Sequence, residues 1–249
     1  MINISKKLLR VVGQTNAKYK MFEEGDKILL GLSGGKDSMS LAHILKHFQS
    51  VSPLKWEFEA VTISYGIGEN LGEISAHFKK HEIPYRIIET KIFEFGKEKI
   101  RANTTFCSFC SRMRRGYLYT YALENGFNKI AIAHHLDDAA ESFFMNFTHN
   151  GALRTLAPKY TAQNGLVIIR PLILARERQL SACAAQNELP VMNEEDSCPA
   201  KQYGGKEPIA RAQTKELLAQ YEKAHPKFFI SLESAFNNIH DDTFFTPKF

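Results

Sequence analysis

The stretch Lys27-Ile28-Leu29-Leu30-Gly31-Leu32-Ser33-Gly34-Gly35-Lys36-Asp37-Ser38 decides how this chain folds. Its first half is a short apolar run, which is typical of a strand buried on both faces of a parallel sheet. Residues 37–48 follow with apolar side chains at helical spacing. A glycine-rich turn between a strand and a helix predicts an anion site, because the first N–H groups of the helix are unpaired and lie at the positive end of its dipole.

The same alternation of strand and helix continues along the chain. Further strands are expected at 58–64, 85–90, 129–133 and 167–172, and further helices at 6–22, 72–81, 112–125, 139–148, 177–187 and 209–223. This order predicts an α/β fold, a doubly wound parallel sheet whose ligands bind at the carboxyl ends of the strands. We expect residues 1–195 to form the α/β domain and residues 196–249 a small helical appendage packed on it.

Composition narrows the class of protein. The 249 residues are 44% hydrophobic, which is ordinary for a folded domain and excludes the disordered class. The formal net charge of +5 permits a polyanionic partner without requiring one. The sequence has no apolar run of about 18 residues and its N-terminus does not resemble a secretory signal. We therefore expect no membrane association and a cytoplasmic location.

The turn supplies the groups that a nucleoside triphosphate needs. The candidate ATP-binding residues are Leu32, Ser33, Gly34, Gly35, Lys36, Asp37 and Ser38. The glycines allow close backbone approach, and the two serines can add hydroxyl donors. Lys36 can bridge phosphate oxygens and Asp37 can hold Mg²⁺, so these two are the candidate catalytic residues. The spacing fits neither the P-loop nor the dinucleotide-binding fingerprint.

A second polar element, His134-His135-Leu136-Asp137-Asp138, follows the strand expected at 129–133. Since it lies at the same edge of the predicted sheet, His134 and Asp137 are further candidates for the ATP site. Both aspartates stand near an expected helix N-cap, and for Asp138 simple capping is an equal alternative. Ser64, at the end of the second expected strand, is a candidate for lining the nucleotide pocket.

The chain has four cysteines, and two of them form a Cys-x-x-Cys motif just before an expected helix. Cys107 and Cys110 are compatible with half a zinc site, a redox pair, cluster ligands or a sulfur carrier. Cys183 falls among small residues inside a helix, which indicates a buried structural thiol. Cys198 lies in a polar loop. Three loop cysteines with no clear fourth ligand fit an iron–sulfur cluster with one open iron site.

The motifs together resemble one known family. Residues 33–38 are similar to the PP-loop of ATP pyrophosphatases, Ser-Gly-Gly-x-Asp-Ser, and 134–138 to their His-x-x-Asp-Asp element. With Cys-Ser-x-Cys-Ser-Arg-x-Arg-Arg-Gly at 107–116 and Ile-Arg-Pro-Leu at 169–172, the chain from 27 to 227 looks like the tRNA 2-thiocytidine synthetase (TtcA) family. Relatives often carry a second Cys-x-x-Cys near the third ligand, whereas this chain has only Cys198 there.

The resemblance implies an ATP-dependent tRNA sulfurtransferase. Such an enzyme adenylates the C2 oxygen of an anticodon-loop cytidine, position 32, and replaces it with sulfur. The implied cofactors are ATP, Mg²⁺ and a [4Fe-4S] cluster held by Cys107, Cys110 and Cys198. The implied partners are tRNA and a cysteine desulfurase as sulfur donor, and the chain could assemble as a homodimer.

Arginines follow the cysteine pair at Arg112, Arg114 and Arg115. Guanidinium groups beside a catalytic loop can grip tRNA phosphates, although a solvated helix face is an equal alternative for each. Two other functions also fit the motifs. One is a different PP-loop adenylating enzyme, such as a tRNA lysidine synthetase or another tRNA sulfurtransferase, and the other is a non-catalytic iron–sulfur or nucleotide-binding protein.

Overall fold

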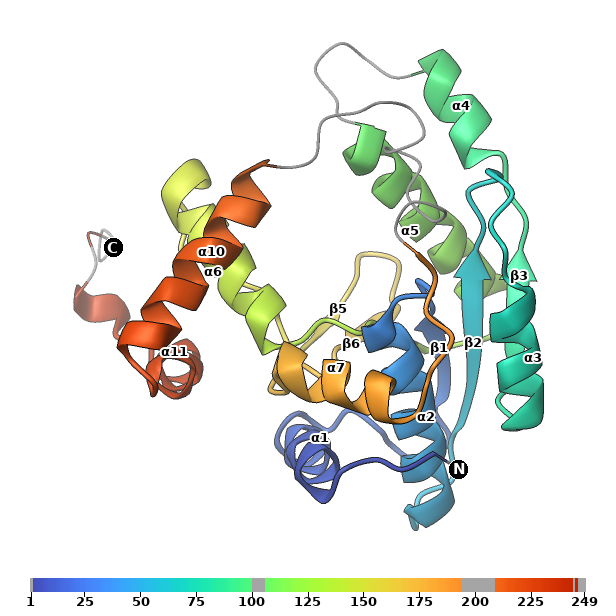
Figure 1. Cartoon of the computed structure of the whole chain (residues 1–249), viewed down its shortest axis with the longest axis horizontal. Helices are drawn as coiled ribbons and strands as arrows, with labels where there is room; N and C mark the ends of the chain where they lie inside the picture. Colours follow the sequence, from blue (N-terminus) through green and yellow to red (C-terminus); the bar gives the residue numbers. More distant parts are fainter. Residues whose placement is uncertain (1, 100–105, 194–208, 244, 246–249) are drawn as a thin grey trace. The chain divides into compact units, whose positions relative to one another are not determined.

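The computed structural model describes residues 2–99, 106–193, 209–243 and 245 (Figure 1). The chain divides into two compact units, Met1–His135 with Ala157–Glu207, and Leu136–Leu156 with Pro208–Phe249. The second unit therefore takes a helix from the middle of the chain, which the expected division at residue 195 assigned to the first domain. In the described ranges, no helix has the length and apolar character needed to cross a lipid bilayer.

A six-stranded sheet forms the centre of the first unit, in the order β3-β2-β1-β4-β6-β5. Its strands are β1 Lys27–Gly31, β2 Glu57–Ile63, β3 Tyr85–Ile88, β4 Lys129–Ala131, β5 Lys159–Thr161 and β6 Val167–Ile169. Every pair is parallel except β5 with β6. The predicted doubly wound α/β fold is confirmed, with an antiparallel edge strand that the sequence pattern did not predict.

Helices cover both faces of this sheet, and alternate residues of β1 identify the faces. Leu30 packs in a core with α1 Lys6–Tyr19, α2 Lys36–Val51, α3 Gly72–Lys80 and α7 Glu177–Gln186. Leu29 packs in the core of the other face with α4 Ile92–Lys99 and α5 Phe106–Glu124. Successive side chains of a strand point to opposite faces of the sheet, and both faces of β1 are covered by helices. Every side chain in the middle of β1 is therefore buried, which explains why apolar and polar residues do not alternate there.

The cysteine pair lies inside a helix, which corrects the prediction of a loop before one. Helix α5 begins at Phe106, so Cys107 and Cys110 belong to its first turns. Phe106 is 5% exposed and its ring lies 5.7 Å from that of Phe93 in α4. A Cβ on Gly96 would lie 2.9 Å from the Phe106 ring, so glycine permits this contact. Packing against α4 explains the early start of α5.

The second unit is a small helical assembly around an aromatic core. It contains α6 Leu136–Asn150, α10 Ile209–Ala224 and α11 Phe228–Asn237, followed by the short helix η1 Asp241–Thr243. The buried core consists of Leu136, Ala140, Leu218, Phe229 and Leu232. Asp137 and Asp138 lie in the first turn of α6 rather than at its N-cap.

An arginine joins two of these helices. Arg211 of α10 donates to Asp138 at 2.5 Å and to buried Glu141 at 2.7 Å. Asp138 therefore has a structural partner within its own unit, in addition to its favourable position at the helix N-terminus.

Three histidines meet between α2 and α3. His43 is 3% exposed, and its Nε2 lies 2.7 Å from Nε2 of His77. The ring of His81 lies 5.0 Å from that of His43. Burial, with the neighbouring His77 and His81, lowers the pKa of His43 to about 3. Burial and His81 lower the pKa of His77 to about 4. The folded protein therefore holds these rings neutral at physiological pH.

This cluster predicts acid-sensitive stability. The folded-state pKa values lie below the ordinary value of 6.5, so the unfolded chain takes up protons first as the pH falls. The stabilisation is complete above pH 6.5 and is lost toward pH 4, by up to about 1.4 kcal/mol per pH unit for each histidine. Urea unfolding between pH 7.5 and 5 should show this slope, and His43→Leu should reduce it. His47→Gln, one turn further along α2, is the control. Equal slopes in His43→Leu and the parent would contradict the assignment.

Candidate active site

The candidate site lies where the sheet changes winding direction. From β1 the chain winds to β2 and β3 on one side, then returns to β4 on the other side of β1. The loop of residues 32–35 follows β1, and His134 and His135 follow β4, so both motifs leave adjacent parallel strands at the same edge (Figure 1). Ligands of doubly wound sheets bind at this switch point.

The two serines of the loop close it upon itself. Ser38 Oγ accepts the N–H of Ser33 at 3.1 Å and donates to the carbonyl of Gly35 at 3.0 Å. Ser33 Oγ lies 3.0 Å from Ser38 Oγ and accepts the N–H of Gly35 at 3.3 Å. Ser38 is 2% exposed. Its hydroxyl therefore shapes the loop, and its predicted role as a phosphate donor stays a prediction.

Gly34 is required at its position for two reasons. Its φ is +80°, a conformation that residues with a Cβ rarely adopt. A Cβ there would also lie 2.4 Å from Sδ of Met192, whose backbone N–H donates to the Gly34 carbonyl at 3.0 Å. The segment after α7 thus covers the loop from one side. Gly35 follows as the N-cap of α2, with extended backbone angles.

Lys36 and Asp37 form a charged group with α7. Lys36 Nζ lies 3.1 Å from Glu177 Oε1 and 3.3 Å from Asp37 Oδ2. Burial lowers the pKa of Lys36, but the two carboxylates outweigh it and the net pKa is above 10.5. Asp37 Oδ2 also lies 3.8 Å from Nε2 of buried His135. Glu177 was not found from the sequence, because 141 residues separate it from Lys36.

His134 is oriented by Arg170, which follows β6. The Arg170 Nε donates to His134 Nδ1 at 3.0 Å, and its Nη1 donates to the Ala157 carbonyl. Arg170 is 6% exposed and stacks 5.4 Å from the Tyr160 ring centre. Because arginine can only donate, Nδ1 of His134 carries no proton, and the proton of a neutral ring sits on Nε2. Asp137 belongs to the second unit, in the first turn of α6.

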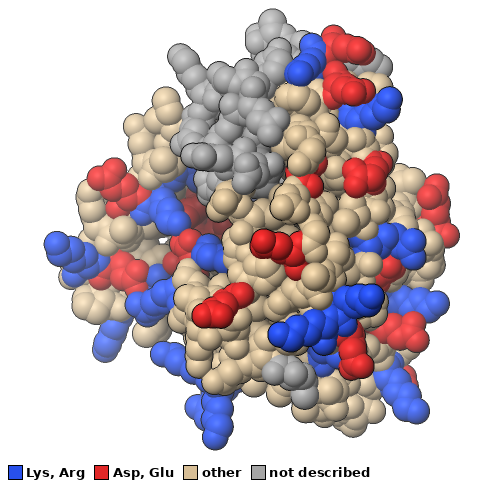
Figure 2. All heavy atoms as spheres, turned by 45° about the vertical axis from the view of Figure 1, so that its right-hand side comes forward, with Lys and Arg blue, Asp and Glu red and all other residues tan. Residues whose placement is uncertain are grey.

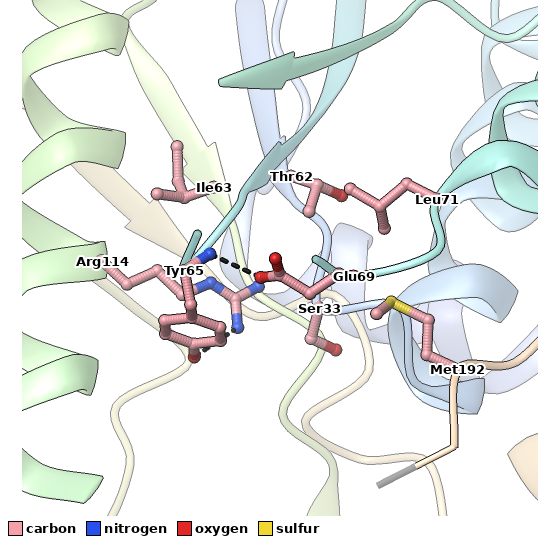
Figure 3. A pocket seen from close by; sticks show the side chains of 8 residues that line it. All are labelled: Ser33, Thr62, Ile63, Tyr65, Glu69, Leu71, Arg114 and Met192. Atoms are coloured by element: carbon pink, nitrogen blue, oxygen red, sulfur yellow. Dashed lines mark hydrogen bonds between the residues drawn. The ribbon is translucent and has the colours of Figure 1, made fainter. Parts of the chain in front are cut away.

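A small pocket opens beside the loop (Figure 3). It is lined by Ser33, Thr62, Ile63, Tyr65, Glu69, Leu71, Arg114 and Met192. The lining includes the neighbours of Ser64 but not Ser64 itself, which is 3% exposed. Its hydroxyl donates to Glu69 at 2.9 Å and accepts the N–H of Gly66 at 3.1 Å. Ser64 therefore shapes the turn after β2 that forms one wall.

The cysteine-bearing helix reaches the same loop. Cys110 is 3% exposed in the core shared by α5 and the sheet. Arg114, one turn further, donates to the Leu32 carbonyl at 2.7 Å. The side chain of Cys107 and the whole of Cys198 lie outside the described residues, so the three-cysteine site stays a prediction. Leu32 is fully buried, so its side chain belongs to the core while its backbone begins the loop.

The three arginines of α5 do not share one surface. Arg112 and Arg115 are exposed, whereas Arg114 is half-buried and lines the pocket. In the view of Figure 2, basic and acidic side chains are interspersed over the visible face. Arg112 and Arg115 are therefore accessible for the predicted tRNA contacts, which stay a prediction. The side chain of Arg114 makes its contacts within the first unit.

The fold and loop define a nucleotide-binding protein of the PP-loop class, and the PP-loop domain model matches residues 3–203. Curated relatives specify the group further. The chain is 37% identical over 240 residues to the tRNA-cytidine(32) 2-sulfurtransferase of Pseudomonas putida (strain GB-1), covering 95% of this chain and 85% of that protein. It is 38% identical to the enzyme of the same name from Geobacter metallireducens, covering 94% and 90%. The chain belongs to the family of PP-loop tRNA-cytidine(32) 2-sulfurtransferases, which confirms the resemblance drawn from the motifs.

A solved structure supports the same assignment. The U34-tRNA thiolase NcsA from Methanococcus maripaludis, determined with its [4Fe-4S] cluster, superimposes with a TM-score of 0.71 at 25% identity. The match covers 94% of this chain and 79% of that one. The likeness therefore extends through nearly the whole chain.

Gly34 provides a test of the loop. Gly34→Ala should weaken ATP binding about tenfold or more, because a left-handed non-glycine residue costs about 1–2 kcal/mol and the Cβ meets Met192. Gly68→Ala is the matched control, with the same φ of +80° and open space around its Cβ. Calorimetric titration with ATP measures both variants. Equal affinities in the two variants would argue against a nucleotide at this turn.

Proposed function

We propose that this chain is an ATP-dependent tRNA sulfurtransferase that converts the cytidine at position 32 of the anticodon loop to 2-thiocytidine. One observation carries the proposal: the helix with Cys107 and Cys110 is hydrogen-bonded, through Arg114, to Leu32, the first residue of the phosphate loop. In this proposal, the residues for phosphate chemistry and the residues for sulfur chemistry meet at this loop. The names of the curated relatives and of the thiolase structure support the same reaction.

The phosphate loop binds ATP in this proposal. The first N–H groups of α2 and the positive end of its dipole face the phosphates. Lys36, kept protonated between Asp37 and Glu177, stabilises the negative charge that develops on the leaving pyrophosphate. Asp37 supplies carboxylate oxygens of the kind that bind Mg²⁺ beside the phosphates. His134, held by Arg170, is proposed to contribute to the same ATP site.

The reaction has two displacements. The C2 oxygen of cytidine attacks the α-phosphorus, the bond between the α-phosphorus and the bridging oxygen breaks, and pyrophosphate leaves. Sulfur at the oxidation level of sulfide then attacks C2, the bond from C2 to oxygen breaks, and AMP leaves with the former carbonyl oxygen. Activation as an AMP ester is what makes that oxygen a good leaving group.

The cysteines provide the sulfur side of the site. Positions 107 and 110 are one helical turn apart, so they can reach a common centre. Cys110 points into the core between α5 and the sheet. This donor set fits a [4Fe-4S] cluster, for which Cys107, Cys110 and Cys198 are the proposed ligands. Such a cluster would supply an iron site open to sulfide, and a cysteine desulfurase together with a thiol reductant in the cytoplasm is the proposed source of that sulfide.

The exposed arginines complete the proposal. Arg112 and Arg115 lie on the outer side of the helix that carries the cysteines. Guanidinium groups there can hold tRNA phosphates and so bring the anticodon loop to the pocket beside Ser33.

The adenylation step is tested at Lys36. Lys36→Ala should lower pyrophosphate release in the presence of tRNA by about a hundredfold or more, because it removes the cation that stabilises the leaving group. Lys27→Ala is the control, since Lys27 is exposed at the opposite end of β1. A coupled phosphate assay after pyrophosphatase treatment measures both. Turnover of Lys36→Ala at the parent rate would remove the loop from the mechanism.

The sulfur step is tested at the cysteines. Anaerobically purified and reconstituted Cys107→Ala and Cys110→Ala should lose bound iron and sulfide and form no 2-thiocytidine, as measured by nucleoside mass spectrometry of unmodified tRNA substrate. Cys183→Ala is the control, because Cys183 is a buried free thiol in α7, where burial raises its pKa. Full thiolation by both variants of the pair, or a product other than 2-thiocytidine from the parent enzyme, would refute the proposed function.

A further inference from the structure

Helix α5 packs on the sheet through a row of residues four positions apart, and one member of that row is charged. Phe106, Cys110, Leu118 and Ala122 are all buried in one apolar core, with exposures of 5%, 3%, 8% and 0%. Arg114 occupies the middle position of this row. Rows of this spacing form the ridges by which helices pack, so an arginine within one must satisfy its donors at the packed surface.

The guanidinium of Arg114 finds its acceptors at the phosphate loop. Nη2 donates to the Leu32 carbonyl at 2.7 Å, and Nη1 donates to the Tyr65 hydroxyl at 3.3 Å. The guanidinium carbon also lies 5.6 Å from the centre of the Tyr65 ring. Figure 3 shows the side chain crossing from α5 into the pocket beside Ser33 and Glu69. Arg114 thus joins α5 to the ends of both β1 and β2.

One turn after Arg114, α5 also contacts the strand that leads into the loop. A Cβ on Gly31 would lie 3.0 Å from Cδ2 of Leu118, so the helix approaches β1 closely there. Leu118 and Arg114 thus attach α5 to the end of β1 at successive turns, one by an apolar contact and the other by a hydrogen bond. Cys110 is one turn from Arg114 toward the helix start, so the hydrogen bond to the loop lies next to the cysteine turn.

We propose that Arg114 is a positioning residue that couples the cysteine turn of α5 to the phosphate loop, so that activation by ATP and delivery of sulfur occur on the same base. This inference rests on the proposed function and specifies how its two halves are aligned. Arg114 acts through the Leu32 carbonyl and Tyr65, not by contact with the reacting atoms. The planar fork of arginine serves two acceptors at once, which a lysine ammonium at the end of a flexible chain does not reproduce.

Arg114→Met should uncouple the release of pyrophosphate from the formation of 2-thiocytidine. The ratio of pyrophosphate released to 2-thiocytidine formed should rise on the order of tenfold, because small misplacement slows the attack of sulfur on C2 and leaves the AMP ester to be hydrolysed by water, which returns cytidine and AMP. Arg114→Lys should show a similar rise. A residue with a merely structural role would lower both products together and leave the ratio unchanged.

Arg86→Met is the matched control. Arg86 of β3 bonds Glu59 at 3.1 Å and lies 5.9 Å from the ring centre of Tyr121, near the far end of α5. It therefore also places a guanidinium between the sheet and the same helix, but away from the cysteines. We expect its product ratio to equal that of the parent enzyme. A ratio that rises equally in Arg86→Met and Arg114→Met would overturn the positioning role.

A measurement without tRNA separates this inference from the proposed function. Hydrogen exchange is followed with and without α,β-methylene ATP, which binds but is not cleaved between the α and β phosphates. In the parent protein and Arg86→Met, the nucleotide should slow exchange at residues 32–38 and also at 106–114. In Arg114→Met, slowing should remain at 32–38 and be lost at 106–114. Slowing at 106–114 that persists in Arg114→Met would overturn the inference, and absence of slowing at 32–38 in the parent would refute the nucleotide site itself.

Chemical rescue distinguishes two roles of Arg114. One is to align α5 with the loop, and the other is to supply a positive charge that acts on the substrate. Millimolar methylguanidinium can refill the space of the lost side chain in Arg114→Ala but cannot connect α5 to the loop. We expect the raised product ratio to persist in its presence. Restoration of the parent ratio would show that Arg114 supplies a charge rather than a link.

Discussion

The hydroxyl group of Ser38 holds the turn between β1 and α2 in one shape, and the rest of the site is arranged around that turn. The hydroxyl bonds backbone groups of Ser33 and Gly35, so the turn is closed from within. Helix α2 begins directly after this turn, and a helix start is a common place for an anion. Gly34 supplies the left-handed backbone that the closed turn needs. The charges of Lys36 and Asp37 are placed by the same geometry, since they begin the helix that follows.

The residues proposed for phosphate chemistry and those proposed for sulfur chemistry approach this turn from opposite faces of the sheet. Helices α2 and α7 lie on one face and bring Lys36 together with Glu177. Helix α5 lies on the other face and brings the cysteine pair. The faces are separated by the sheet except at the carboxyl ends of its strands, where the Leu32 carbonyl accepts from Arg114. In the proposed function, the doubly wound fold provides one edge at which the activated base and the sulfur donor meet.

The sequence was a good guide where a local pattern carried the information. The apolar run before Ser33 predicted β1 within one residue, because a strand buried on both faces needs continuous apolar side chains. The three-residue strand β5 was missed, since an edge strand of that length leaves little periodic signal. Helix α5 begins earlier than predicted because Phe106 packs on α4, and this contact is invisible in the helix's own pattern.

Partners that are distant in the chain could not be predicted. Glu177 meets Lys36 only because α7 packs beside α2, and Arg170 meets His134 only because β6 pairs with β4. Arg114 looked like Arg112 and Arg115 in the sequence, as part of one basic group. Helical geometry separates them, since residues one and two positions away point to other sides of the helix. The roles of similar residues in one motif were decided by rotation about the helix axis.

The composition of the second unit has a consequence for biosynthesis. Its core joins Leu136 and Ala140 of α6 to Leu218, Phe229 and Leu232, which are made much later. About 60 residues separate the end of α6 from the start of α10. At roughly 5–20 residues per second, the ribosome needs several seconds to supply the missing helices. During that interval the apolar side of α6 has no native partner within its unit, which makes the nascent chain a natural client for chaperones that shield aromatic surface.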